Sequence, residues 1–326
     1  MSDKILLIRG GAVGDFILTL PTVALLRQGF PKARVEILGR PHIVQLVEGR
    51  YYAEKTLDLD SPSLSGFFCP DAKPDYPWTN YFSGFQQIIS YLYDPDEVFT
   101  RNLYRCGVHR IIQGSPKIQA GRHAAFQLAQ PLESLGLFLR DPAARLFPSE
   151  SDRQSAHNVL HTKAISDNNP FIVIHPGSGS QRKTWPATHW RNFCLDFLRT
   201  FSQFSILCVG GESDKLALDF LRNQLHSSRL AFLEHLSLPI LAAVLSKTSA
   251  YAGHDTGISH IAAAVGAPCF LLYGPTDPRV WAPAHPTVHV LTSSTGMMED
   301  LSTKTVFGAF EFFLTTYAGS RNGFSY

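Results

Sequence analysis

Residues 251–278, YAGHDTGISHIAAAVGAPCFLLYGPTDP, constrain the fold more than any other part of this sequence. Their pattern predicts a strand at 249–252, a helix of small residues at 258–265 and a second, fully apolar strand at 268–273. A glycine-containing turn follows each of the two strands. In open α/β sheets, the turns at the carboxyl ends of the strands line the ligand crevice. The segment therefore predicts a parallel α/β sheet with a binding site at one edge.

The first of these turns, GHDTG, has the residues of an anion site. Asp255 or Thr256 can cap the helix that follows, and Gly257 lets a ligand approach the backbone closely. The free N–H groups at a helix N-terminus suit a phosphate. The competing interpretation is that these residues only cap a core helix, which leaves the second polar turn on the same edge unexplained.

Length and composition indicate a globular protein of two domains. With 326 residues, 44% of them hydrophobic and 17% charged, the chain can bury two cores of ordinary size. A formal net charge of +2 argues against a nucleic-acid partner. No apolar run has the length of a membrane span, and the first residues lack the apolar length of a signal peptide. A cytoplasmic location is therefore expected.

The cysteines and histidines do not match a known disulfide or metal-binding motif. The five cysteines are scattered without a CxxC pair, and the 13 histidines include no HExxH motif. We therefore expect neither a disulfide network nor a metal site.

The N-terminal half alternates between strands and helices, an order that predicts a parallel sheet with right-handed crossovers. An excursion rich in aromatic residues and proline, 61–81, interrupts this order. The strands are expected at 4–8, 34–38, 56–59, 88–92 and 110–112, and the helices at 16–27, 43–48, 97–106 and 123–135.

The turn after the first strand, RGGAVGD, leaves two roles open for its aspartate. A dinucleotide site would need G-x-G-x-x-G here, but only Gly11 and Gly14 are in place, so a nicotinamide-dependent dehydrogenase is disfavoured. Asp15 stands at the start of a helix, where it can cap the helix or accept a proton in a cleft. The residues alone favour the cap.

The C-terminal half follows a polar linker with one helix, 149–169, and opens with a strand at 171–174. The strand leads into HPGSGSQRKTWP, a loop that contains Ser178, Gly179 and Lys183. A Gly/Ser loop before a helix can cradle phosphates, with lysine as a mobile charge, whereas basic turns are commonly only solvated.

Further strands are expected at 206–209 and 231–233, and a terminal helix rich in phenylalanine at 303–317. Glu212 follows the first of these strands, where a carboxylate can bind the two hydroxyls of a ribose. Its alternative role is to cap the next helix, for which Ser213 and Asp214 compete.

Three signatures in combination resemble the family-9 glycosyltransferases, typified by the ADP-heptose:lipopolysaccharide heptosyltransferases. They are RGGAVGDFILTLP, HPGSGSQRKTWP, and HDTGISHIAAAVGAP followed by YGPTDP. The resemblance implies an α/β fold of the GT-B type, with two Rossmann-like parallel-sheet domains and an interdomain cleft. The first domain is expected at 1–150 and would bind the acceptor. The second is expected at 151–326 and would bind the nucleotide-sugar, and the last helix could pack back on the first domain.

The resemblance also implies an enzyme that moves a sugar, with inversion, from an ADP-sugar such as ADP-heptose to a lipopolysaccharide-core or related glycolipid or oligosaccharide acceptor. It assigns the general base to Asp15 and contact with the donor diphosphate to Lys183, with no metal or other cofactor. The remaining residues that we expect to bind the donor are Gly14, Ser178, Gly179, Glu212, Asp255, Thr256, Gly257 and His260. A cytoplasmic enzyme at the inner face of the inner membrane is the expected setting.

Two alternatives stay open at this point. One is an epimerase or hydrolase of nucleotide-sugars with the GT-B fold, which would act without an acceptor. The other is a non-catalytic protein that binds a nucleotide-sugar. The 61–81 excursion is likewise open, because Tyr76 and Trp78 can contact an acceptor sugar or cover the edge of the first sheet.

Overall fold

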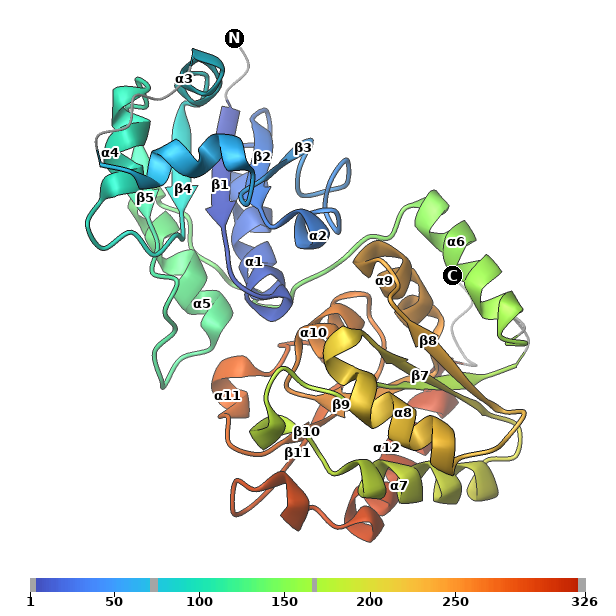
Figure 1. Ribbon diagram of the computed structural model, residues 1–326. Helices are drawn as coiled ribbons and strands as arrows, with labels where there is room; N and C mark the ends of the chain where they lie inside the picture. Colours follow the sequence, from blue (N-terminus) through green and yellow to red (C-terminus); the bar gives the residue numbers. More distant parts are fainter. Residues whose placement is uncertain (1–3, 71–75, 166–168, 322–326) are drawn as a thin grey trace. The chain divides into compact units, whose positions relative to one another are not determined.

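The computed structural model describes residues 4–70, 76–165 and 169–321 (Figure 1). The chain divides into two compact units, Met1–Phe147 and Pro148–Tyr326. Each unit is built on its own sheet, and all the strand pairs of both sheets run parallel. The prediction of two parallel-sheet α/β domains is confirmed.

The first sheet has the strand order β3-β2-β1-β4-β5. Its strands are β1 (Lys4–Arg9), β2 (Arg34–Gly39), β3 (Lys55–Asp58), β4 (Gln87–Ser90) and β5 (Ile111–Gln113). Strands β1 and β4, in the interior of the sheet, are almost entirely buried, as parallel strands covered on both faces tend to be, whereas the edge strands β3 and β5 are partly exposed. The chain builds outward from β1 to β3 and then returns to add β4 on the other side of β1. The direction of winding therefore reverses between β1 and β4.

The helices of the first unit lie on both faces of this sheet. They are α1 (Val13–Gly29), α2 (Pro41–Val44), α3 (Tyr76–Ser83), α4 (Val98–Arg105) and α5 (Ala124–Ala129), with the 3₁₀ helices η1 (Pro62–Phe68) and η2 (Gln130–Leu135). Helix α1 packs on α5, and α4 packs on η1. The single helix expected at 123–135 is instead α5 followed by η2. Pro131 lies at the junction, and because proline has no N–H it cannot continue an α-helical ladder.

The aromatic excursion covers one face of the first sheet. Phe67 and Phe82 are buried there among the apolar side chains of β1, β2 and β4. Trp78 is partly buried, and its ring stacks on Phe82 and meets Phe67 edge-on. This packing supports the sheet-covering role that the sequence left open. Residues 71–75 and the side chain of Tyr76 lie outside the described part of the chain.

The second sheet has six strands in the order β11-β10-β9-β6-β7-β8. The strands are β6 (Phe171–Ile174), β7 (Ser205–Gly210), β8 (Leu230–Glu234), β9 (Ala250–His254), β10 (Cys269–Tyr273) and β11 (Val288–Thr292). Strands β6, β9 and β10 are buried along their whole length, as the unbroken apolar sequences of β6 and β10 predict. Strand β11, which the sequence analysis did not predict, is an edge strand whose residues are only partly buried or exposed.

Helices cover both faces of the second sheet as well (Figure 1). They are α6 (Glu150–Thr162), α7 (Ala187–Thr200), α8 (Lys215–Gln224), α9 (Leu238–Lys247), α10 (Gly257–Ala264), α11 (Pro278–Trp281) and α12 (Thr303–Arg321), with η3 (Gln181–Lys183), η4 (Glu212–Asp214) and η5 (Met298–Asp300). One core joins side chains of α7, α8 and α12 to the sheet, and α6 packs on α9.

The last helix, α12, has its apolar face in the core of the second unit. Its buried side chains are Val306, Phe310, Phe313 and Leu314. Phe310 meets Phe193 of α7 edge-on. This face of the helix is therefore already covered within its own unit. In the described part of the chain, no helix combines the length and the apolar character needed to cross a bilayer.

Candidate functional site

In each sheet, the point at which the strand order reverses is the expected position of a ligand. In the second unit the chain lays down β6, β7 and β8 in one direction and then returns to add β9 beside β6. The loops that leave β6 and β9 therefore diverge, and the crevice between them at the carboxyl ends of the strands is the usual ligand position of such sheets. Both loops carry sequence-predicted site residues: Lys183 follows β6, and Asp255, Thr256 and Gly257 follow β9.

A short ion pair joins the two loops. Lys183 Nζ lies 2.7 Å from Asp255 Oδ2, and the Lys183 side chain is 32% exposed while that of Asp255 is 9% exposed. The same carboxylate oxygen accepts a hydrogen bond of 2.9 Å from Thr276 Oγ1, in the turn after β10. An ammonium group has three hydrogens, so Lys183 keeps two with which to donate to an anion.

The N-terminus of α10 lies next to this ion pair in the sequence. Thr256 is the N-cap of the helix, and its Oγ1 accepts a hydrogen bond of 3.4 Å from Ser259 N. Asp255, the other candidate for the cap, is engaged by Lys183 instead. Gly257 begins the helix without a side chain to shield the backbone. The first turn of α10 therefore offers N–H groups to an anion beside a partly exposed lysine.

Behind this turn, a buried chain of hydrogen bonds connects three strand ends. Asp214 Oδ2 lies 3.2 Å from His175 Nε2, and His175 Nδ1 lies 3.3 Å from Thr256 Oγ1. Burial alone would raise the pKa of Asp214, but hydrogen bonds from His175, from Gly211 N–H and from Ser213 hold it below its ordinary value. The carboxylate therefore stays ionised and orients the imidazole toward the cap of α10.

Gly177 makes room for this carboxylate. A Cβ atom at position 177 would lie 1.8 Å from Asp214 Oδ1, which is inside any acceptable contact distance. The glycine of HPG is therefore required by close packing of the backbone on Asp214. Gly179, two residues later, has no heavy atom within 4 Å of the corresponding position.

A second buried histidine, His254, fixes the loop after β6. Its Nε2 accepts hydrogen bonds from Trp185 N at 3.0 Å and from Trp190 Nε1 at 3.3 Å. Its Nδ1 must then carry the proton that is donated to Gly177 O, at 3.1 Å. Burial lowers the pKa of His254 to about 4, so the ring is neutral at physiological pH.

The other residues predicted for the donor differ in exposure. Glu212 is exposed in η4, directly beyond β7, and is thus available to a ligand. Gly179 is exposed and Ser178 is partly buried in the loop after β6. His260 is 4% exposed, so its imidazole is buried.

In the first unit, Asp15 follows β1, one of the two strands between which the winding reverses. It is the third residue of α1, and its Oδ2 accepts a hydrogen bond of 3.0 Å from Ala12 N. Gly11 has φ +95°, and a Cβ atom there would lie 2.8 Å from the same oxygen. Asp15 therefore caps α1 from the third position of the helix, through the backbone N–H of Ala12, and Ala12 rather than Asp15 is the N-cap residue. Gly14 lies in the first turn of the same helix.

A buried arginine lies beside Asp15. Arg9 Nη2 is 3.7 Å from Asp15 Oδ1, and the Arg9 side chain is 2% exposed while that of Asp15 is 33% exposed. Burial lowers the pKa of Arg9, and the charge of Asp15 opposes that shift. Among the described residues, Arg9 Nε and Nη2 have no hydrogen-bond partner. Arg9 thus places a positive charge close to a partly exposed carboxylate.

Sequence reasoning missed His175, Asp214 and His254. Asp214 was considered only as a cap, and the two histidines were treated as part of the loops that contain them. The available signal was the position of each histidine at the end of a buried strand, in HPG and in HDTG. In the described part of the chain, no group of three or more His, Cys, Asp or Glu side chains is arranged to hold a metal ion.

Comparison with known proteins relates this chain to one family. The model of glycosyltransferase family 9 (heptosyltransferase) matches residues 100–310. Lipopolysaccharide heptosyltransferase 1 of Salmonella typhimurium is 30% identical over 138 residues, which cover 40% of this chain and 40% of that protein. The chain thus matches well under half the length of this curated relative.

Two solved structures share the fold over nearly the whole chain. A family-9 glycosyltransferase of Veillonella parvula is 20% identical, with a TM-score of 0.82 over 96% of this chain and 97% of that one. The E. coli heptosyltransferase WaaC with ADP is 18% identical, with a TM-score of 0.70 over 95% of this chain and 99% of that one.

Proposed function

The chain belongs to glycosyltransferase family 9, the heptosyltransferase family, and from that premise we propose that it transfers a sugar from a nucleotide-sugar to a lipopolysaccharide-core or related glycolipid acceptor. The donor that we propose is ADP-heptose. This choice is supported by the curated relative, a lipopolysaccharide heptosyltransferase, and by the similar solved structure, which contains ADP.

The observation that carries the proposal is the ion pair between Lys183 and Asp255 beside the N-terminus of α10. A diphosphate in this position would receive hydrogen bonds from the lysine and from backbone N–H groups of Thr256 and Gly257. These donors would stabilise the charge that develops on the diphosphate as it leaves. Glu212, exposed beyond β7, is the proposed acceptor for the ribose hydroxyls.

Asp15 is the proposed general base of a single displacement. The acceptor oxygen attacks the anomeric carbon and gives its proton to Asp15, while the bond from that carbon to the diphosphate oxygen breaks and ADP departs. Attack opposite to the leaving group inverts the anomeric configuration. Because Asp15 Oδ2 is engaged by Ala12 N–H, the proton would go to Oδ1. Arg9 Nη2 lies 3.7 Å from this oxygen.

The two substrates are proposed to divide between the two units. The anion-binding groups Lys183, Thr256 and Gly257 all belong to the second unit, which would take the donor, and Asp15 belongs to the first, which would take the acceptor. The proposed setting of the reaction is the cytoplasm, at the inner face of the inner membrane, where a glycolipid acceptor would be presented. Trp78 packs on Phe67 and Phe82, so the proposed acceptor site is not built on this ring.

A nucleotide-release assay tests the proposal. The purified chain is incubated with ADP-heptose, with UDP- and GDP-sugars as comparators, in the presence and absence of glycolipid extracted from a heptose-deficient bacterium. We expect ADP release that depends on the extract, together with labelled heptose in the lipid fraction. ADP release without extract would indicate a hydrolase, and conversion of the donor sugar without net ADP release would indicate an epimerase. Saturable binding of a donor that stays unchanged would indicate a binding protein.

A further inference from the structure

A groove in the first unit lies away from Asp15, on the outer surface of α1. Its cavity has a volume of about 450 Å³. The floor is the helix face formed by Pro21, Ala24, Leu25 and Gln28. Ten residues separate Asp15 from Leu25, which corresponds to about 15 Å along the helix axis. The groove is therefore separate from the carboxyl-end turn that carries Asp15.

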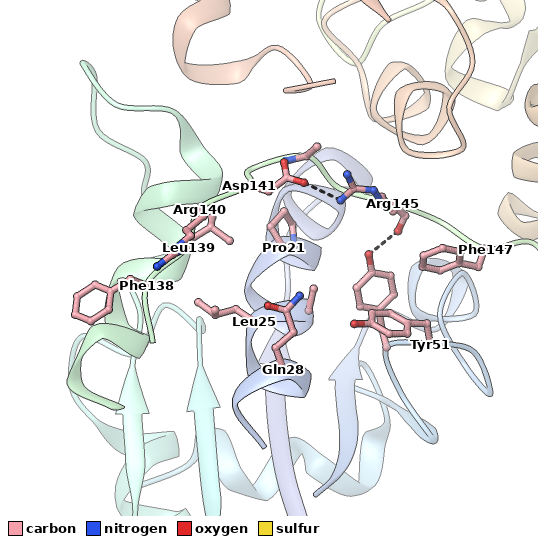
Figure 2. Close-up of a pocket in the computed structure, with 13 residues that line it drawn as sticks. Pro21, Leu25, Gln28, Tyr51, Phe138, Leu139, Arg140, Asp141, Arg145 and Phe147 are labelled. Carbon is pink, nitrogen blue, oxygen red and sulfur yellow. Dashed lines mark hydrogen bonds and ion pairs between the residues drawn. The ribbon is translucent and has the colours of Figure 1, made fainter. Parts of the chain in front are cut away.

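Two arms form the sides of the groove, as Figure 2 shows. Phe138, Leu139 and Arg140 lie on one side of α1, and Tyr51 and Phe147 lie on the other. The chain between these arms, 138–147, crosses over the helix as a strap.

The strap is held at both ends. Leu137, just before it, packs so closely on the end of α1 that a Cβ atom at Gly29 would lie 2.6 Å from its Cδ2. At the other end, Tyr52 Oη donates a hydrogen bond of 2.7 Å to Arg145 O, and Ala143 is buried. The groove therefore exists before any ligand arrives, as small-molecule sites usually do.

The groove exposes aromatic surface. Phe138 is 63% exposed, Tyr51 45% and Phe147 44%. Tyr51 and Phe147 are in edge-to-face contact with each other, with ring centroids 5.5 Å apart. Large apolar side chains that gather around a concave surface, with some of their area left open to water, are typical of a binding site.

The charges around the groove leave one cation unneutralised. Arg145 pairs with Asp141 at 2.9 Å, so these two lining residues compensate each other. Arg140 also lines the groove, and in the described part of the chain its side chain makes no ion pair or hydrogen bond. A guanidinium beside apolar walls is complementary to a carboxylate or phosphate that carries an apolar body.

We propose that this groove binds one small amphipathic anion, taken up as a free monomer, with its apolar chain against Leu25, Phe138 and Tyr51 and its acidic group on Arg140. The cavity volume is that of a drug-sized ligand and is too small for a folded partner. The proposal does not depend on the proposed glycosyl transfer, because it uses neither Asp15 nor any residue of the second unit.

Calorimetric titration of the full chain with decanoate, below the concentration at which it forms micelles, tests the proposal. We expect one molecule bound per chain, and weaker binding of decyl glucoside, which has the same chain without the charge. Arg140→Gln should reduce the affinity for decanoate about three- to tenfold and leave that for decyl glucoside unchanged, whereas Arg140→Lys should restore part of the loss. Phe138→Ser should weaken the binding of both compounds.

Two exposed positions of the same unit supply matched controls. Arg34→Gln removes an exposed arginine elsewhere, and Tyr104→Ser removes an aromatic ring that is 50% exposed on α4. Neither change should alter decanoate binding. Equal affinities for wild type, Arg140→Gln and Phe138→Ser would overturn the proposal. So would co-sedimentation with phosphatidylglycerol vesicles that depends on Arg140 while free decanoate does not bind, since the groove would then recognise a membrane surface.

Discussion

Lys183 Nζ and Asp255 Oδ2 lie 2.7 Å apart although 72 residues separate them in the sequence. Asp255 is nearly buried and also receives a hydrogen bond from Thr276, so the carboxylate is the fixed member of the pair and the lysine is the member that it orients. This arrangement gives Asp255 a specific role. It holds the ammonium at the start of α10, where the proposed diphosphate would lie.

Lys183→Ala should weaken binding of ADP by roughly 1.5–3 kcal/mol, the range for a hydrogen bond to a charged group, and should also lower turnover. The physical reason is the loss of a donor that Asp255 holds in place. Calorimetry with ADP measures the first effect directly. Arg182→Ala is the matched control, because Arg182 is the exposed basic neighbour in the same loop. Equal losses in both variants would mean that only the net charge of the loop matters.

Asp15→Asn should lower turnover about 10²–10⁴-fold while ADP binding is retained, since an amide cannot accept the proton that a general base must take. Asparagine still offers an oxygen to Ala12 N–H, so this variant preserves the cap. Rates are measured by ADP release in the presence of acceptor.

Asp15→Ala separates the two roles of this residue. It removes both the base and the cap, and the free energy of unfolding should fall by about 0.5–2 kcal/mol in addition to the loss of rate. If Asp15→Asn turns over normally and only Asp15→Ala is impaired, then Asp15 serves α1 as a cap and the base lies elsewhere.

The fold was largely predictable because its strands are short apolar runs followed by turns. Strands β1, β6 and β10 are buried throughout or nearly so, and such runs stand out in a sequence. Strand β11 escaped prediction because its sequence, VHVLT, mixes polar residues into a half-exposed edge strand. The break between α5 and η2 could have been predicted from Pro131.

The candidate site was predictable only where a residue type has a strong local preference. Lys183 and Thr256 precede helices and Asp15 lies in the first turn of one, so the local sequence indicates a possible role for each of them. The contact between His175 and Asp214 has no such signal, because 39 residues separate the two and only the pairing of β6 with β7 brings them together. Thr256 rather than Asp255 caps α10 because Asp255 is paired with Lys183, which lies 72 residues away in the sequence, and no local pattern shows that pairing.

Gly177→Ala should destabilise the second unit by at least about 1–3 kcal/mol, the usual cost of overpacking, because the new methyl group would collide with Asp214. The collision would also push Asp214 off His175 and disturb the cap of α10, so ADP binding should weaken as well. Denaturant unfolding and calorimetry measure the two effects. Gly179→Ala, in the same loop but with open space at its Cβ position, should unfold like the wild type. Equal stability of all three proteins would show that the loop relaxes freely around Asp214.

His254 should make the second unit less stable in mild acid. Its pKa is lowered by burial from 6.5 to about 4, so the folded protein binds a proton less readily than the unfolded chain. The contribution of this residue is therefore fully present above pH 6.5 and is lost progressively as the pH falls toward 4. A difference of about 2.5 units corresponds to a loss of roughly 3 kcal/mol.

Urea unfolding at pH 7, 5.5 and 4 measures this loss, with tryptophan fluorescence as the probe because Trp185 and Trp190 both contact His254. Carboxylates also titrate in this range, so the informative quantity is the difference between wild type and His254→Asn. The variant should be less stable at pH 7, since an amide cannot make all three hydrogen bonds of the ring in the same geometry. Its stability should nevertheless fall less steeply with acid, because it has no imidazole to protonate. Parallel pH dependences for the two proteins would mean that His254 titrates in the folded state much as it does in the unfolded chain.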